Sequence, residues 1–278
     1  MRIDQLLVQR GLASTRSQAQ RLIAGGVEWQ QGIDWRRVAK NGDDVPEDAE
    51  LRLLDDSEAR YVSRGGLKLE AALKQVGLSV SGFQCLDVGQ STGGFTDCLL
   101  QQGARFVVGV DVGSAQLHPK LHADPRVLCV EGLNARALNA SDLVAAYEES
   151  MGAEGQFDVD EDDGGAPGFE FVPEFDLIVA DLSFISQTLV LPAVVPLLKA
   201  GGTLLTLVKP QFELQPGQVG KRGIVTDPSL YAVVERRLRD CCASLGLEVR
   251  GWYDSAVTGG DGNREFFIHA TKTGRHPS

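Results

Sequence analysis

The sequence predicts an α/β protein in which a Rossmann-like domain follows a small N-terminal α+β domain. From residue 84 onward, continuous apolar segments alternate with helical segments, which is typical of a mostly parallel sheet covered on both faces. Residues 86–97, "LDVGQSTGGFTD", join one such strand to a helix through a glycine-rich turn, as in nucleotide-binding α/β folds. We therefore expect a small domain over residues 1–60, a linker over 61–66 and the Rossmann-like domain over 67–278.

The small domain is predicted to contain two helices and two strands. Residues 3–10 carry apolar side chains at helical spacing. Thr15 stands three residues before Gln18, which predicts a capping box for a second helix that a Gly-Gly pair ends. The segments "VEWQQG" and "DAELRLL" are strand-like. Five side chains of the two helices could hold a polyanion or simply form a solvated surface: Arg2, Arg10, Arg16, Gln20 and Arg21.

The larger domain follows a repeated strand–helix order. Strands are predicted at residues 85–89, 106–112, 126–130, 175–183, 203–209 and 265–272, and helices at 95–103, 142–150, 188–202 and 228–246. In sheets of this kind, ligands bind outside the carboxyl ends of the strands, near the point where the strand order reverses. The sequence therefore predicts a site at that edge.

Charge is distributed unevenly along the chain. The net charge is −11, but residues 152–174 alone hold eight Asp/Glu and no Lys/Arg, so we interpret them as an acidic insertion loop. Residues 1–40 hold seven Lys/Arg and three Asp/Glu. A nucleic-acid partner requires a local basic face rather than a basic total, so the overall charge does not exclude one.

Other bulk features point to a cytoplasmic protein. No apolar run is long enough to span a membrane, and the first residues, "MRIDQLLVQRG", lack the apolar core of a signal peptide. The five cysteines form no C-x-x-C pair, which favours buried free thiols over disulfides or zinc. His118 and His122 are four residues apart, but Pro119 lies between them and no third ligand is near, so we expect no metal site.

Polar residues and glycines follow the ends of the predicted strands. The glycine-rich turn matches neither the Gly-x-Gly-x-x-Gly dinucleotide pattern nor the P-loop pattern. Structural alternatives remain for single residues, since Asp181 and Lys209 could form an ion pair between neighbouring strands and Lys68 could lie along a helix surface. The candidate site residues, from several separate segments, are Lys68, Asp87, Gly89, Gly93, Gly94, Asp111, Asn134, Asp181, Lys209 and Glu265.

At these residues the sequence resembles the TlyA family, in which an S4-type RNA-binding domain precedes a methyltransferase domain similar to the FtsJ ribose 2'-O-methyltransferases. The segment "RIDQLLVQRGLASTRSQAQRLIAGG" resembles the S4 signature. The segments "VSRGGLKLEAAL", "DVGQSTGGFTD", "DLIVADLSFIS", "LVKPQFE" and "GNREFF" occur in the family's order and spacing. The match covers nearly the whole chain except residues 152–174, although Gln90 stands where the family usually has a small residue.

The resemblance implies an S-adenosylmethionine-dependent enzyme that methylates the ribose 2'-hydroxyl of a nucleotide, cytidine by analogy, in ribosomal RNA or ribosomal subunits. It assigns the Lys–Asp–Lys–Glu catalytic tetrad to Lys68, Asp181, Lys209 and Glu265, with Lys209 contacting the hydroxyl. The cofactor would lie on Asp87, Gly89, Gly93, Gly94, Asp111 and Asn134. The RNA would be held by Arg2, Arg10, Arg16, Gln20 and Arg21.

Three other interpretations remain open at this point. The chain could bind ribosomal RNA without catalysis, although its tetrad is intact. It could be a membrane-active haemolysin, a label often given to this family, although it has neither a spanning segment nor a strongly basic amphipathic helix. It could also methylate a small molecule, in which case the N-terminal domain would be dispensable for turnover.

Overall fold

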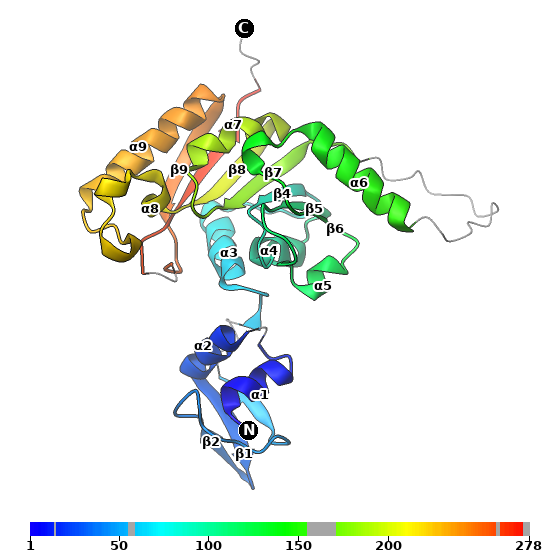
Figure 1. Cartoon of the computed structure of the whole chain (residues 1–278), viewed down its shortest axis with the longest axis vertical. Helices are drawn as coiled ribbons and strands as arrows, with labels where there is room; N and C mark the ends of the chain where they lie inside the picture. Colours follow the sequence, from blue (N-terminus) through cyan, green and yellow to red (C-terminus); the bar gives the residue numbers. More distant parts are fainter. Residues whose placement is uncertain (14, 55–58, 155–170, 260–261, 275–278) are drawn as a thin grey trace, which may run out of the picture. The chain divides into compact units, whose positions relative to one another are not determined.

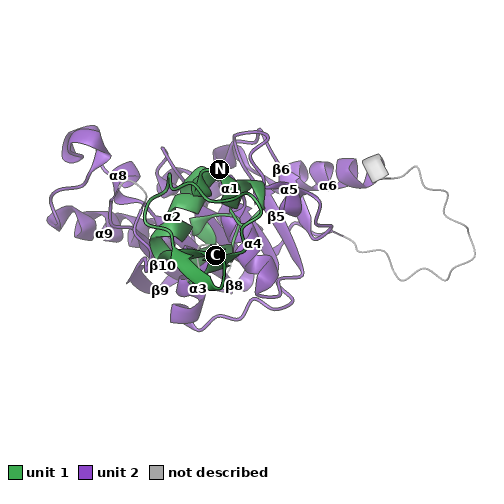
Figure 2. Cartoon of the chain, turned by 90° about the horizontal axis from the view of Figure 1, so that it is seen from below, with its two compact units in different colours: residues 1–67 green, residues 68–278 purple. Residues whose placement is uncertain are grey.

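The computed structural model describes residues 1–13, 15–54, 59–154, 171–259 and 262–274, which form two compact units, residues 1–67 and 68–278 (Figure 2). The unit boundary falls inside helix α3 (Arg64–Val76), so the last three residues of the predicted linker are helical. Most of the predicted acidic loop, residues 155–170, lies outside the described residues. Its first residues, 152–154, belong to helix α6 (Ala140–Glu154).

The N-terminal unit consists of two helices and a three-stranded antiparallel sheet. Helices α1 (Ile3–Gln9) and α2 (Arg16–Gly26) pack their apolar faces on strands β1 (Val27–Gln31) and β3 (Leu51–Leu53). Strand β2 (Asp34–Arg37) pairs with the other edge of β1, giving the order β2-β1-β3. The expected cap is only half formed, because Thr15 Oγ1 accepts from the Gln18 N–H at 3.2 Å while the Gln18 side chain donates to the Tyr61 carbonyl.

The larger unit contains a seven-stranded sheet with the order β6-β5-β4-β7-β8-β10-β9. The first five strands are parallel, and β10 is antiparallel to both of its neighbours, which confirms the mostly parallel sheet. The strands are β4 (Gln84–Val88), β5 (Phe106–Val110), β6 (Val127–Val130), β7 (Phe175–Asp181), β8 (Leu198–Val208), β9 (Leu247–Asp254) and β10 (Phe266–Lys272).

Helices cover both faces of this sheet (Figure 1). One face carries α3, α4 (Gly94–Gln101) and α5 (Pro119–His122), and the other carries α6, α7 (Leu191–Val194) and α9 (Ser229–Ser244). The core under α6, α7 and α9 is a continuous apolar cluster centred on β4, β7 and β8. Short turns complete the unit: α8 (Pro210–Glu213) and the 3-10 turns η2 (Ala135–Ala137), η3 (Gln187–Leu189), η4 (Val195–Leu197), η5 (Pro216–Gln218) and η6 (Lys221–Gly223).

The structure corrects one predicted helix and contains two strands, β2 and β9, that were not predicted. The helix expected at 188–202 is wrong, because only Leu191–Val194 is α-helical and β8 already begins at Leu198. Pro192 and Pro196 lack the N–H that a continuous helix needs, so each can only start a new turn. Strand β9 was not predicted, although it pairs with β10 along its whole length. No helix in the described part of the chain is long and apolar enough to cross a membrane.

Candidate active site

The glycine-rich turn is held by close contacts that only glycine permits. Gly89 follows β4 with φ +83°, and a Cβ there would lie 2.8 Å from the backbone oxygen of Asp181. Gly93 is the N-cap of α4 with φ +94°, and a Cβ there would lie 2.4 Å from a methyl group of Leu121. The turn therefore packs against the Asp181 backbone at Gly89 and against a leucine side chain at Gly93, where α4 begins with Gly94.

Asp87 lies beneath this turn, fully buried on the face of β4 that carries α4. Its Oδ2 accepts a hydrogen bond from Thr96 Oγ1 at 2.7 Å, and Gln90 Nε2 donates to that hydroxyl at 2.9 Å. Its Oδ1 has no protein partner among the described residues. Burial raises the pKa of Asp87 to about 7, since nothing in its surroundings fully replaces the water lost to the charged form.

Gln90, the residue that departs from the family pattern, fills space that a neighbouring glycine leaves. A Cβ on Gly109, in the middle of β5, would lie 2.0 Å from the Gln90 side-chain amide. The larger side chain is therefore accommodated by the absence of one on β5. Gln90 is also bonded to Thr96, so it braces the turn rather than disturbing it.

A cavity of about 580 Å³ opens at the carboxyl ends of β4, β5 and β7. Among the residues that line it are Gly89, Asp111, Asn134, Asp181 and Phe184. Asp111 is fixed on the turn, because its two oxygens accept from the N–H groups of Ser91 and Gly113, both at 2.7 Å. The Asn134 side chain caps η2 by accepting from the Arg136 N–H at 3.1 Å. The structure therefore brings together predicted residues from three separate strand ends.

The four tetrad residues form two ion pairs. Lys68 Nζ lies 2.5 Å from Glu265 Oε2, with both side chains buried. Lys209 Nζ lies 2.6 Å from Asp181 Oδ1 and donates to Ser183 Oγ at 2.9 Å. Asp181 and Lys209 therefore form an ion pair between neighbouring strand ends, and Asp181 lines the cavity.

The sheet register brings the two pairs to one edge. Phe266 of β10 stands opposite Val208 of β8, so continuing this antiparallel register by one residue sets Glu265 opposite Lys209. Residues opposite each other in such a pair have Cα atoms roughly 5 Å apart. Asp181 is the last residue of β7 and stands opposite Leu207 of β8. Asp181, Lys209 and Glu265 thus lie at the ends of three neighbouring strands, and Lys68 of α3 pairs with Glu265.

Sequence analysis missed a buried network behind Lys209 and Asp181. Glu213, at the end of α8, accepts from Ser186 Oγ at 2.5 Å and from the Gln187 N–H at 2.7 Å. Gln187 in turn donates to the Leu207 carbonyl at 2.7 Å and accepts from Thr206 Oγ1 at 2.7 Å. Burial raises the pKa of the Glu213 carboxyl above its ordinary value. A glutamate among apolar residues four positions after Lys209 was the available signal.

Phe184 is a second residue that sequence analysis missed. It is 90 % exposed, has φ +64° and lines the cavity. Its ring centroid lies 5.0 Å from that of Phe212. An exposed aromatic ring in a strained backbone conformation offers a stacking surface at the mouth of the site.

In the N-terminal unit, three predicted RNA-binding arginines have protein partners. Arg2 and Arg16 both bond to the buried carboxylate of Asp4, at 3.0 and 2.8 Å. Arg10 donates to the backbone carbonyls of Ala49 and Glu47 and so fastens α1 to the loop before β3. On α2, Gln20 is exposed and Arg21 is half-buried.

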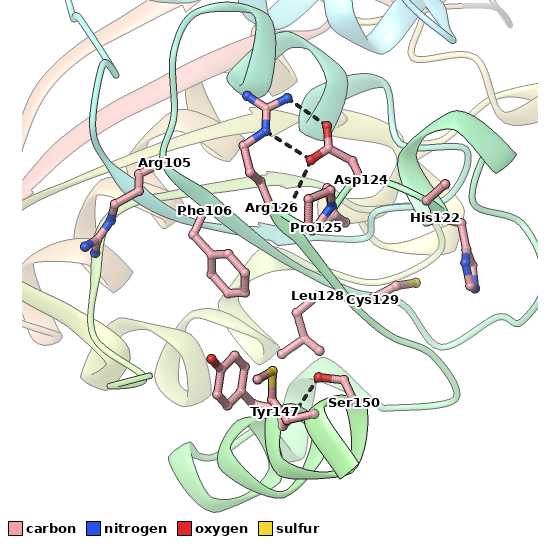
Figure 3. A pocket seen from close by; sticks show the side chains of 13 residues that line it. Arg105, Phe106, His122, Asp124, Pro125, Arg126, Leu128, Cys129, Tyr147 and Ser150 are labelled. Atoms are coloured by element: carbon pink, nitrogen blue, oxygen red, sulfur yellow. Dashed lines mark hydrogen bonds and ion pairs between the residues drawn. The ribbon is translucent and has the colours of Figure 1, made fainter. Parts of the chain in front are cut away.

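Another cavity, of about 630 Å³, lies at the opposite ends of the strands (Figure 3). It is formed by the starts of β5 and β6 and by Tyr147 and Ser150 of α6, and Tyr147 points toward Phe106 and Leu128. Arg126 and Asp124 close one side through a bidentate ion pair. None of the predicted site residues is among its lining residues, whereas Gly89, Asp111, Asn134 and Asp181 line the cavity at the carboxyl ends.

Comparison with known proteins decides the family. Residues 61–272 match the model of the FtsJ-like methyltransferase family, and residues 1–26 match the S4 domain model. The chain belongs to the FtsJ-like methyltransferase family. It is an S-adenosylmethionine-dependent methyltransferase with an S4 domain at its N-terminus, which confirms the predicted fold class, enzyme class and cofactor.

Several relatives of this FtsJ-like methyltransferase match it along most of their length. The 16S/23S rRNA (cytidine-2'-O)-methyltransferase TlyA of Mycobacterium tuberculosis is 40 % identical over 96 % of this chain and 88 % of its own. Hemolysin A of Brachyspira hyodysenteriae is 33 % identical over 97 % and 99 %. A solved structure from Streptococcus thermophilus, titled as a hemolysin, has 38 % identity and a TM-score of 0.68 and covers 99 % of this chain and 89 % of its own.

Proposed function

We propose that this FtsJ-like methyltransferase transfers the methyl group of S-adenosylmethionine to the ribose 2'-hydroxyl of a cytidine in ribosomal RNA, free or in ribosomal subunits. The main support is the Lys209–Asp181 pair at the rim of the cavity, with Lys68–Glu265 in the neighbouring register. A relative of 40 % identity is named for this reaction. The proposed substrate implies that the enzyme acts in the cytoplasm.

The cavity fits the cofactor on three counts. Gly89 of the glycine turn lines the cavity, and among the described residues no side chain caps the start of α4. The Asp111 carboxylate retains lone pairs for ribose hydroxyls beside the two N–H groups that fix it. Asp87 Oδ1 is a buried acceptor for which the described residues provide no hydrogen-bond donor. We assign Asp87, Gly89, Gly93, Gly94, Asp111 and Asn134 to the cofactor.

The chemistry requires alignment and removal of one proton. Bound S-adenosylmethionine supplies an electrophilic methyl group whose leaving group is a neutral thioether. We assign Lys209 to the ribose hydroxyl, whose proton passes to solvent water while the Lys209 ammonium stabilises the negative charge that develops on the oxygen. Asp181 and Ser183 hold the Lys209 side chain in one orientation. Lys68 and Glu265 form the second ion pair of the tetrad, and we assign this pair to positioning the ribose.

The first prediction is that Lys209→Ala abolishes methyl transfer, lowering kcat by at least about 1000-fold. Cofactor affinity should change by less than about threefold, because Lys209 is not among the residues assigned to the cofactor. Methyl transfer is measured with radiolabelled S-adenosylmethionine and ribosomal RNA, and cofactor binding by calorimetry. Turnover of the variant close to that of the wild-type protein would contradict the assignment.

Lys199→Ala is the matched control. Lys199 lies near the start of the same strand, β8, and forms the same kind of pair with Asp176 of β7, at 2.6 Å. The Lys199→Ala variant therefore loses an equivalent ion pair at the edge of the sheet away from the cavity. We expect this variant to retain wild-type turnover. A wild-type protein that binds cofactor and ribosomal RNA but transfers no methyl group would instead support the non-catalytic binding protein.

A further inference from the structure

One buried carboxylate organises two arginines of the N-terminal unit. Asp4 is 0 % exposed, and the Arg2 guanidinium bonds to it through two atoms, Nε to Oδ1 and Nη2 to Oδ2, both at 3.0 Å. Arg16 Nη2 donates to Oδ2 at 2.8 Å from the start of α2. The bonds from Arg2 hold the pKa of the Asp4 carboxyl well below its usual range, so Asp4 is charged at every working pH.

The group of three side chains has an excess positive charge that faces solvent. Two guanidinium groups share one carboxylate, while the Arg2 and Arg16 side chains remain 47 % and 54 % exposed. Each guanidinium has five N–H donors, and Asp4 takes two from Arg2 and one from Arg16. Donors are therefore left for a second, external anion.

Fixed geometry matters here because the unit as a whole is not basic. Residues 1–67 hold ten Lys/Arg and eleven Asp/Glu, so a net attraction for RNA does not arise from their sum. A free arginine side chain has many rotamers and loses part of that entropy when it binds. Asp4 has already restricted two of them, and the planar guanidinium forks match phosphate oxygens.

We propose that Asp4 is a positioning residue that holds Arg2 and Arg16 as a preformed site for one phosphodiester of the RNA. The inference rests on the proposed RNA substrate and names the group that this surface takes. It also separates Arg10 from the pair, because Arg10 is bonded to the neutral carbonyls of Ala49 and Glu47 rather than to Asp4.

The test compares two substitutions with the same change in charge. Asp4→Asn and Asp44→Asn each remove one negative charge near Arg2, since the exposed Asp44 also acts electrostatically on Arg2. Charge alone predicts tighter RNA binding for both. Preorganisation predicts that Asp44→Asn binds as tightly as the wild-type protein or more tightly, whereas Asp4→Asn binds about 5- to 10-fold more weakly. Filter binding to purified 16S and 23S ribosomal RNA measures both.

Two further measurements exclude a merely structural effect. The double variant Arg2→Lys, Arg16→Lys retains every charge and loses the forked geometry, so it should also bind more weakly while its urea unfolding matches that of the wild-type protein. In Asp4→Asn, the slope of log Kd against log salt should fall by about one, as expected for one lost phosphate contact. Equal RNA affinity for Asp4→Asn and Asp44→Asn would overturn the inference.

The comparison of RNA binding by the Asp4→Asn and Asp44→Asn variants does not depend on methyl transfer. The same comparison is repeated in proteins that also carry Lys209→Ala, in which no chemistry is expected. If the wild-type protein proves inactive but the Asp4 effect persists, the proposed reaction fails and the phosphodiester site stands. If methyl transfer is intact and the two asparagine variants bind alike, only the role of Asp4 fails.

Discussion

Asp87 shows how a single buried carboxylate links the cofactor turn to pH. Its two oxygens have different surroundings, since Oδ2 accepts from Thr96 and Oδ1 has no protein donor in the described part of the chain. A charged carboxylate in that position is unfavourable without a further donor. The folded protein therefore binds the Asp87 proton more tightly than the unfolded chain does.

This difference predicts a pH dependence of stability. Burial raises the pKa of Asp87 from 3.8 to about 7. The protonated carboxyl therefore contributes to the free energy of unfolding in full below the pKa of the unfolded chain, and this contribution is lost as the pH rises through the pKa of the folded protein. The free energy of unfolding should fall by a few kcal/mol between about pH 4 and pH 7. Asp87→Asn cannot titrate, so it should lack this part of the decrease. Urea unfolding at several pH values measures both, and parallel curves would refute the prediction.

At the scale of the elements, hydrogen bonds join the loop after β7 to helix α8, and together these two segments support Asp181 and Lys209. Asp181 ends β7 where this loop begins, Ser183 lies on the loop, Lys209 precedes α8, and the loop and α8 meet again where Ser186 bonds to Glu213. Arg237 of α9 donates to the Glu213 backbone carbonyl at 2.6 Å, which ties this support to the last long helix. The position of Lys209 therefore depends on the contacts that Glu213, four residues further along the chain, makes with Ser186 and Arg237.

Glu213→Ala is predicted to lower kcat by about tenfold or more with little change in cofactor affinity, because the loop that carries Asp181 would no longer be fixed. The buried N–H of Gln187 and the Ser186 hydroxyl would lose their acceptor, which should reduce the free energy of unfolding by about 2–4 kcal/mol. Steady-state kinetics and urea unfolding check the two effects. A variant that loses stability but retains kcat would show that Glu213 supports the fold alone.

Glu235→Ala is the control for this element. Glu235 pairs with Arg239 along α9 at 2.7 Å, and both side chains are partly exposed. Exposed pairs of this kind contribute about 0.5 kcal/mol or less. Stability and turnover should therefore stay close to those of the wild-type protein.

Local sequence patterns explain which strands and helices could be predicted. The buried parallel strands were located correctly because continuous apolar runs such as "LIVA" in β7 need no tertiary information. Strand β9 was missed because its alternation is broken by Gly251 and its residues are only partly buried at the sheet edge. The segment 188–202 has the composition of a helix, yet its two prolines divide it into short turns.

The candidate site was predictable only in part, for a related reason. Tetrad and turn residues were named from local motifs, and the structure groups them at one edge of the sheet. Glu213 and Asp4 have no local signature, because their importance lies in partners distant in the sequence: Ser186 for Glu213 and Arg16 for Asp4. Side chains that act through others become visible only when the contacts are known.

At the scale of the whole molecule, charge and chemistry are divided between the two units. The tetrad and the cofactor cavity belong entirely to residues 68–278. The paired arginines belong to residues 1–67. With a net charge of −11, the chain as a whole repels polyanions, so affinity for RNA must come from particular contacts. Salt should therefore lower the affinity for RNA much more than the affinity for the cofactor.

Each phosphate contact releases counterions, and the one proposed contact predicts a loss of at least about threefold in RNA affinity between roughly 50 and 200 mM NaCl. We expect KM for ribosomal RNA to rise accordingly, while Kd for S-adenosylmethionine, measured in parallel, changes by less than about twofold. Arg2→Ala with Arg16→Ala should flatten the dependence of KM on salt and leave the cofactor Kd unchanged. An unaltered KM in that double variant, at every salt concentration, would mean that the N-terminal unit is dispensable for turnover, as for a methyltransferase of small molecules.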